Sequence, residues 1–272
     1  MRRPAPQTLE DIQHPGPKAH NRLPFSLCHA STVSVPLEVS SPLVEVLGRW
    51  ADDAGFTSAV LDLSGIELSA FDYVMPDRAV DDRHVAWYSD THSSNGATLD
   101  EAVAVLGWRD GNWFAHVHAY WHEGGRSHLG HLLPHTLTTA ANATLPGYGI
   151  KGARFEAAED PETEFTLYRV KAGELPDDLQ ANALITTLAP FEDFHSSVAT
   201  LSKELDAGTI NLMGLGSFAG AGFHEGPAMT GLISEILVRP GVTLQTTSDF
   251  QIPVRCVDLN GDLFEGLAKP GK

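Results

Sequence analysis

Hydrophobic residues from position 43 onward recur at the spacing of a helix. Leu43, Val46, Leu47 and Trp50 lie three or four positions apart, so they share one face and predict an amphipathic helix. Gly55 is expected to end this helix. The next letters, F-T-S-A-V-L-D-L-S-G, indicate a buried strand that ends in a turn.

A strict alternation follows in W-F-A-H-V-H-A-Y-W, residues 113–121. Its odd positions are apolar and its even positions are aromatic or histidine, which predicts a strand with two different faces. The letters E-G-G-R come soon afterwards, and Gly124-Gly125 favours a two-residue hairpin turn because both positions tolerate φ > 0. Counted from that turn, His118 lies opposite His131, and His116 is the diagonal neighbour on the same face.

The plan of a helix, a strand and a glycine-containing turn occurs twice. In the second copy P-F-E-D-F-H-S-S leads into V-A-T-L-S-K-E-L-D-A-G, a short strand and G-L-G-S-F-A-G-A-G-F. The equivalent positions are Pro36 with Pro190, Glu38 with Glu192, Val44 with Val198, Leu47 with Leu201 and Gly65 with Gly216. We therefore expect two copies of one α/β unit.

The repeat divides the chain into four predicted parts. These are an N-terminal arm at 1–35 that is irregular and then forms a short strand, a first domain at 36–170, a linker at 171–185 and a second domain at 186–272. The second copy lacks counterparts of the first copy's final strands, so we expect it to be truncated or completed by a partner.

Composition narrows the functional classes. The 272 residues are 42% hydrophobic, no apolar run is long enough for a membrane span, and M-R-R-P-A-P has no apolar stretch of a signal peptide. Cys28 and Cys256 match no metal or redox spacing, so a cytoplasmic, reduced protein is expected. The formal charge of −17, from 18 basic and 35 acidic residues, argues against binding to nucleic acid.

Six of the thirteen histidines fall within residues 113–135. The predicted register lets His116, His118 and His131 converge on one ion, with Zn–N distances of about 2.0–2.1 Å. The alternative is a set of core or surface histidines without an ion, but burying three of them would leave several ring nitrogens unsatisfied. We therefore predict a divalent metal, Zn²⁺ first. His122 and His128 are placed on or beside the opposite face, near the turn, as surface residues.

The hairpin H-V-H-A, E-G-G-R, L-G-H-L-L resembles the PPC (plants and prokaryotes conserved) domain family. So do L-D-L-S-G-I-E-L-S-A-F and P-F-E-D-F-H-S-S-V, and the resemblance covers about residues 36 to 265 as two tandem domains. It implies an α/β (α+β) fold with a curved, mostly antiparallel sheet, flanking helices and trimer-type packing. It also implies a metal held by the three histidines.

Two departures from the family pattern matter. The Arg-Gly-Arg-Pro core of an AT-hook is absent. The second copy has lost its histidines, because Gly266 aligns with the third ligand and V-R-C at residues 254–256 replaces H-V-H. One metal site per chain is therefore expected.

Three histidines without a fourth protein ligand are typical of catalytic zinc, whose open position holds water or a substrate oxygen. We therefore expect a metal-dependent hydrolase or lyase acting on a small polar carbonyl or carboxylate compound, in a homo-oligomer. Ligation without a carboxylate leaves a positive site that suits anionic substrates. The alternatives are a non-enzymatic PPC-domain regulatory or DNA-associated protein with a structural metal, and a ligand-binding scaffold.

Other residues are expected to complete such an active site. His135 is the candidate general acid or base because imidazole titrates near neutral pH, and Tyr120 could hydrogen-bond a substrate or oxyanion. The stretch A-F-D-Y-V-M-P-D-R-A-V-D-D-R-H-V-A-W-Y-S-D-T-H is expected to line the pocket, and otherwise forms an ordinary loop and edge strand. Its candidate substrate-binding residues are Tyr73, His84, Tyr88 and Asp90.

Overall fold

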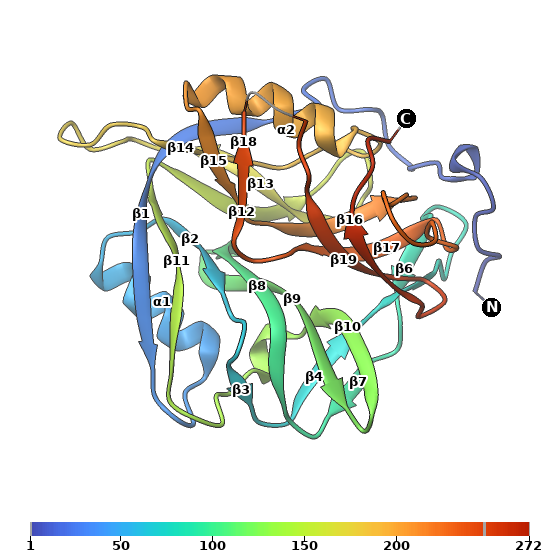
Figure 1. The fold of residues 1–272 in the computed structure, drawn as a ribbon, viewed down its shortest axis with the longest axis horizontal. Coiled ribbons are helices and arrows are strands. Elements are labelled where there is room, and N and C mark those ends of the chain that lie inside the picture. The colour runs from blue at the N-terminus through green and yellow to red at the C-terminus, as the bar shows by residue number, and fades with distance from the viewer. Residues whose placement is uncertain (1, 247–248, 272) are drawn as a thin grey trace.

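The computed structural model describes residues 2–246 and 249–271, which form mostly antiparallel strands with two α-helices (Figure 1). The strands up to residue 172 are β1 (Phe25–Leu37), β2 (Ser58–Asp62), β3 (Glu67–Leu68), β4 (Phe71–Val74), β5 (Pro76–Arg78), β6 (Ala86–Tyr88), β7 (His92–Ser94), β8 (Ala97–Arg109), β9 (Asn112–Glu123), β10 (Arg126–Leu132), β11 (Ala143–Lys151), β12 (Ala153–Glu159) and β13 (Thr166–Ala172). The later strands are β14 (Ala183–Thr186), β15 (Thr209–Leu212), β16 (Leu215–Ala219), β17 (Ile233–Val238), β18 (Val242–Gln245), β19 (Pro253–Asp258) and β20 (Leu263–Leu267).

The helical elements are few and short. They are α1 (Leu43–Asp53) and α2 (Phe194–Ser202), with 3-10 turns η1 (Leu9–Asp11), η2 (Pro134–Thr136) and η3 (Lys203–Leu205). Within the described part of the chain, no helix has the length and apolar character needed to cross a membrane. The predicted class, a mostly antiparallel sheet with flanking helices, is confirmed, although the helix content is low.

The helix predicted from the apolar spacing is α1. Its residues Leu43, Leu47 and Ala51 are fully buried against the large sheet, which explains the periodicity. Gly55 follows the helix with φ +65°, a conformation that glycine adopts without steric cost. The predicted buried strand after it is β2.

The large sheet has the order β14-β1-β11-β2-β8-β9-β10-β4-β7, and β12, β13 and β3 attach beside this path. β1 begins at Phe25, inside the segment predicted as an arm, because its residues pair with both β11 and β14. β14 begins at Ala183, inside the predicted linker, and adds a strand to the first half's sheet. The irregular arm therefore ends before β1.

The second half forms a four-stranded sheet, β16-β17-β19-β20, and a two-stranded one, β15-β18. In the first half, β2 and β3 both pair with the long strand β8. In the second half, the two strands that follow the helix pair with two separate strands, β15 with β18 and β16 with β17. Pro240 and Gly241 separate β17 from β18, because proline has no N–H for the ladder. Val254 lies opposite Gly266 in this half. If Gly266 corresponds to His131, Val254 takes the place of His118, so the alignment of V-R-C with H-V-H is out of register.

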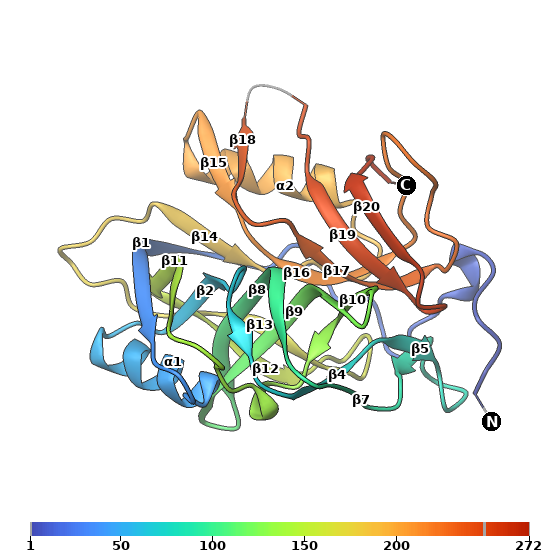
Figure 2. The ribbon, with the colours of Figure 1, turned by 60° about the horizontal axis from the view of Figure 1, so that its bottom comes forward.

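The four-stranded sheet packs over the β8-β9-β10 part of the large sheet (Figure 2). Leu129, Leu237 and Val257 form a small buried cluster between the two sheets. Beside this cluster Glu101 of β8 accepts hydrogen bonds from Arg239 at 3.0 Å and from Arg255 at 2.9 Å. The two halves thus meet through an apolar contact with an ionic network at its side.

Candidate metal centre

The hairpin of β9 and β10 places three histidines on one face. Gly124 and Gly125 form its turn with φ of +59° and +76°, and His131 pairs directly with His118. His116 shares their face because it lies two residues before His118. The predicted register is therefore confirmed.

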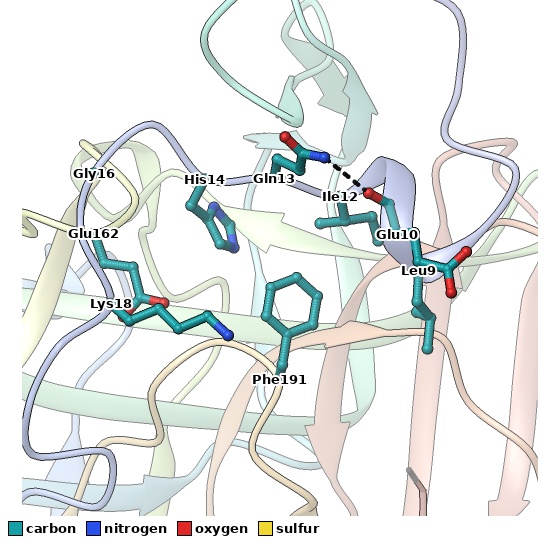
Figure 3. A pocket seen from close by; sticks show the side chains of 9 residues that line it. All are labelled: Leu9, Glu10, Ile12, Gln13, His14, Gly16, Lys18, Glu162 and Phe191. Atoms are coloured by element: carbon teal, nitrogen blue, oxygen red, sulfur yellow. Dashed lines mark hydrogen bonds between the residues drawn. The ribbon is translucent and has the colours of Figure 1, made fainter.

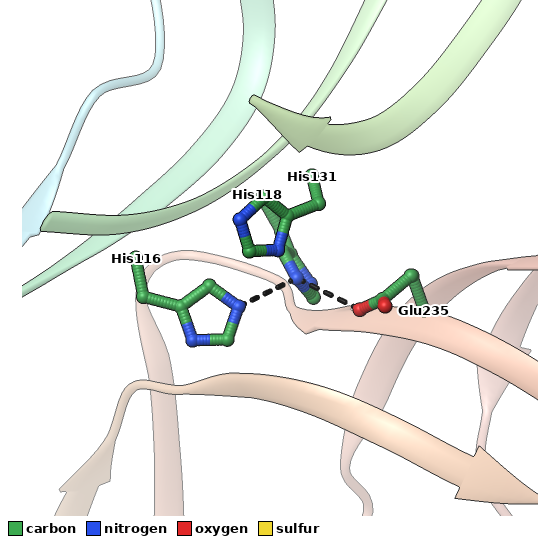
Figure 4. A group of neighbouring side chains, drawn as sticks. All are labelled: His116, His118, His131 and Glu235. Atoms are coloured by element: carbon green, nitrogen blue, oxygen red, sulfur yellow. Dashed lines mark hydrogen bonds and ion pairs between the residues drawn. The ribbon is translucent and has the colours of Figure 1, made fainter. Parts of the chain in front are cut away.

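A fourth side chain comes from the second half of the chain. Glu235 of β17 approaches this face, with its Oε2 atom 2.8 Å from Nε2 of His118 (Figure 4). One ligand atom from each of His116, His118, His131 and Glu235 lies within 4.8 Å of the others. The expectation of a site without a carboxylate or fourth protein ligand is thus corrected, because packing of β17 on the hairpin brings Glu235 in.

The surroundings of His118 fix which of its nitrogens faces the cluster. Its side chain is fully buried, and its Nδ1 lies 2.7 Å from the Ile236 carbonyl oxygen, which can only accept a proton. In the neutral ring Nε2 therefore carries a lone pair, and it lies 3.0 Å from Nε2 of His116 as well as 2.8 Å from the Glu235 carboxylate. Contacts this short between a lone pair and a carboxylate need a cation between them, either a proton or a metal ion.

Burial keeps the other two rings in the form that binds metals. Burial, followed by the neighbouring His131 and His118, lowers the pKa of His116 well below its usual value. Burial and His118 lower the pKa of His131 to about 4, with Glu235 opposing. Both rings are thus neutral at pH 7. The Nδ1 atom of His131 is buried without a hydrogen-bond partner among the described residues, so one nitrogen of this ring is left without a polar contact.

Tyr88 is the predicted substrate-binding residue that lies beside this cluster. The centroid of its ring is 5.4 Å from that of His131. Burial and the nearby Glu235 raise the pKa of its phenol, and 41% of the residue's surface is exposed. Tyr88 is therefore a half-exposed neighbour of His131.

The structure places the other three predicted substrate-binding residues elsewhere. Tyr73 is buried in the core with its ring 4.8 Å from that of Trp121, because β4 pairs with β10 and turns Tyr73 to the apolar face. His84 lies in a loop with its Nδ1 2.8 Å from the Asp81 carboxylate. Asp90 extends into solvent and forms an ion pair with an N-terminal arginine at 3.4 Å.

Within the described part of the chain, His135 and Tyr120, the predicted catalytic residues, form no hydrogen bond, ion pair or ring contact with the cluster. His135 is exposed on η2, after β10 has ended. Tyr120 shares the ligand face, but its hydroxyl donates to Ser127 at 3.1 Å and lies 3.3 Å from Nε2 of His122. The catalytic roles of both therefore stay predictions without geometric support at the metal centre.

The assignment of faces was wrong for His122. It lies on the same face as Tyr120, since residues two apart in a strand point the same way, and it is exposed. His128 lies on the opposite face as predicted, but it is partly buried, with its ring stacked on Trp121 at 5.3 Å.

A pocket lies away from the metal centre. It measures about 470 Å³ and is formed where the N-terminal arm passes over Glu162 and Phe191 (Figure 3). None of the four clustered residues lines it. The sequence offered no signal for this pocket, because the arm has no periodic pattern.

Comparisons with known proteins find partial structural likeness. No protein-family model and no curated protein matches the chain. Among solved structures, a candidate DNA-binding protein from Ralstonia eutropha is 18% identical with a TM-score of 0.40, over 50% of this chain and 89% of its own. A metal-containing protein from Archaeoglobus fulgidus is 15% identical with a TM-score of 0.39, over 54% and 97%. A PPC protein from Pyrococcus horikoshii is 16% identical with a TM-score of 0.38, over 53% and 94%. The structures similar to this chain thus include a member of the family that the histidine hairpin resembles.

Proposed function

We propose that this protein binds one divalent metal ion, of the zinc type, through His116, His118, His131 and Glu235. The observation that carries the proposal is the convergence of four buried or partly buried donor atoms within 4.8 Å. Three imidazoles and one carboxylate are ligands that zinc accepts in tetrahedral geometry. In such a shell neighbouring donor atoms are about 3.3 Å apart. The distances from His118 Nε2 to Glu235 Oε2, 2.8 Å, and to His116 Nε2, 3.0 Å, need to lengthen only slightly to reach this value.

In this proposal the ion joins the two halves of the chain. Its three imidazole ligands come from β9 and β10 and its carboxylate comes from β17. The same strand β17 also orients a ligand, because the Ile236 carbonyl accepts the Nδ1 proton of His118. Binding of the ion therefore stabilises the packing of one sheet on the other.

A second function, a metal-dependent hydrolase or lyase for a small carbonyl or carboxylate compound, is supported by Tyr88. His116 and His131 are only partly buried, and the half-exposed Tyr88 ring lies 5.4 Å from the ring of His131. A zinc ion held by the four residues would supply Lewis acidity only to a substrate that joins the shell as a fifth ligand. Tyr88 would orient the substrate by a hydrogen bond. The Glu235 carboxylate offsets one of the ion's two charges, so the preference for anionic substrates is weaker than a site of three histidines alone would give.

Metal analysis of the purified protein tests the proposal. We expect one zinc-type ion per chain in the wild type, and a loss of most of it in His131→Gln. The exposed His135→Gln, a substitution on the same segment, should keep the metal. A wild-type protein that neither contains a metal nor takes one up after purification without chelators would disprove the metal centre. Turnover of a small carboxylate substrate that is unchanged by complete removal of the ion would disprove the catalytic role alone.

A further inference from the structure

A serine, a histidine and an aspartate lie in line at the outer end of the same hairpin. Ser127 Oγ is 3.0 Å from Nε2 of His122, and Nδ1 of His122 is 2.7 Å from the Asp100 carboxylate. The carboxylate can only accept, so the Nδ1 proton is donated to it and Nε2 is left as the acceptor for the serine hydroxyl. This is the arrangement of nucleophile, base and orienting acid by which triads are recognised on unrelated folds.

The backbone explains how these three residues come together. Ser127 and His122 are paired directly opposite each other across the β9–β10 hairpin. Asp100 sits at a β-bulge, because the register of β8 and β9 shifts between Leu99 and Glu101. A bulge re-aims the side chain of the extra residue, and here it directs Asp100 toward His122.

A cavity adjoins the serine. It measures about 170 Å³ and lies between this hairpin and the β19–β20 hairpin of the second half. Both polar and apolar residues line it: Tyr120, Ser127, Leu129, Arg255, Cys256, Leu263, Phe264 and Glu265. The Arg255 guanidinium lies 4.1 Å from the centre of the Tyr120 ring and is paired with Glu101 and Glu265, so the cavity carries little free positive charge.

We propose that Ser127, His122 and Asp100 form a second site that hydrolyses short, uncharged carboxylic esters without a metal ion. Ser127 and His122 are the catalytic residues, and Asp100 is a positioning residue that acts through His122. The small, partly apolar cavity suits a short acyl chain, and the chain's net charge of −17 disfavours anionic esters. The site lies outside the metal centre and does not depend on it.

The reaction begins when Ser127 Oγ attacks the ester carbonyl carbon and its proton passes to Nε2 of His122. The C–O bond to the alcohol then breaks, and the alcohol leaves with that proton. Water next attacks the acyl-serine, gives a proton to Nε2, and releases the carboxylic acid as Ser127 regains its hydrogen. Ester and water are thus converted to acid and alcohol, and Asp100 stabilises the imidazolium form throughout.

The experiment uses p-nitrophenyl acetate with the full chain in EDTA. We expect release of p-nitrophenol and a transient acetyl group that peptide mass mapping places on Ser127. Ser127→Ala should abolish both, whereas Ser93→Ala should keep both, since Ser93 is also exposed but its hydroxyl donates to a carboxylate, that of Asp72. Asp100→Asn should lower kcat by about 100-fold or more with KM nearly unchanged, a split that a merely structural role would not produce.

Two results would overturn the proposal. One is hydrolysis by Ser127→Ala at the wild-type rate, which would assign any turnover to another group. The other is turnover that disappears in EDTA and returns with zinc, which would assign it to the metal centre. Thermal melts of the variants check folding, and little change is expected because His122 and Asp100 are about half exposed.

Discussion

Removing the metal ion should lower the melting temperature by an amount set by the ion's free concentration. The four donors come from β9, β10 and β17, so the unfolded chain does not hold them together. Binding to the folded state alone contributes RT ln(1 + [L]/Kd). This is about 2.7 kcal/mol when the free ion is at 100 times Kd and about 4.1 kcal/mol at 1,000 times Kd.

The size of the chain converts these free energies into temperatures. Unfolding entropy is about 2.1 cal/mol/K per residue, which for 272 residues gives about 0.6 kcal/mol/K. If the two halves unfold together, the melting temperature should rise by about 5 °C at 100 times Kd and by about 7 °C at 1,000 times Kd.

Differential scanning fluorimetry of protein stripped with EDTA and titrated with zinc measures this rise. Glu235→Gln keeps the side chain's size but removes its charge, so its titration should move to a higher zinc concentration. Glu67→Gln, an exposed carboxylate change, should follow the wild type. A melting temperature that does not respond to zinc would refute the metal centre. A Glu235→Gln titration identical to the wild type would refute the fourth ligand alone.

Three further predictions concern stability. In the metal-free protein, unfolded His131 gains a proton near pH 6.5 while burial holds its folded pKa at about 4, so stability should fall as pH decreases across that window. This group alone should change the free energy of unfolding by about 1.4 kcal/mol per pH unit. Urea unfolding of His131→Gln should therefore show a weaker dependence of the unfolding free energy on pH. Glu101→Gln breaks the ionic network between the halves and should cost about 2–3 kcal/mol in urea unfolding, whereas a cost as small as that of Glu67→Gln would contradict a role in holding the halves together. Gly130→Ala would bring a Cβ within 2.9 Å of a backbone oxygen of β4. It should lower the free energy of unfolding by about 1–3 kcal/mol and weaken metal uptake, as measured by calorimetry and metal analysis. Gly208→Ala is the control, because nothing lies within 4 Å of a Cβ at that position.

The sequence predicted local geometry well because that geometry depends on short-range rules. The Gly124-Gly125 turn sets the register of the hairpin, and period-two alternation then places His118 opposite His131. The same period-two rule places His122 on the face of the ligands, so its predicted position on the opposite face did not follow from the pattern.

Other features depend on contacts that no local pattern encodes. Glu235 is a lone acidic residue in the apolar strand I-S-E-I-L-V, and such a buried charge is a signal that a partner is needed. Its partner, however, is set by how one sheet packs on another. The burial of Tyr73 was missed for a similar reason. The face to which a side chain of the four-residue strand β4 points depends on the pairing of β4 with β10.

The link between His118 and the Ile236 carbonyl spans 118 residues of sequence, and this separation fixes the order of events during synthesis. The histidine hairpin emerges from the ribosome well before β17, so early in synthesis the nascent chain carries three imidazoles without the carbonyl that orients them or the fourth donor. Loops this long close slowly, because the entropy of closure is lost before the contact is gained. The four donor groups can therefore come together only after the second half has folded onto the first.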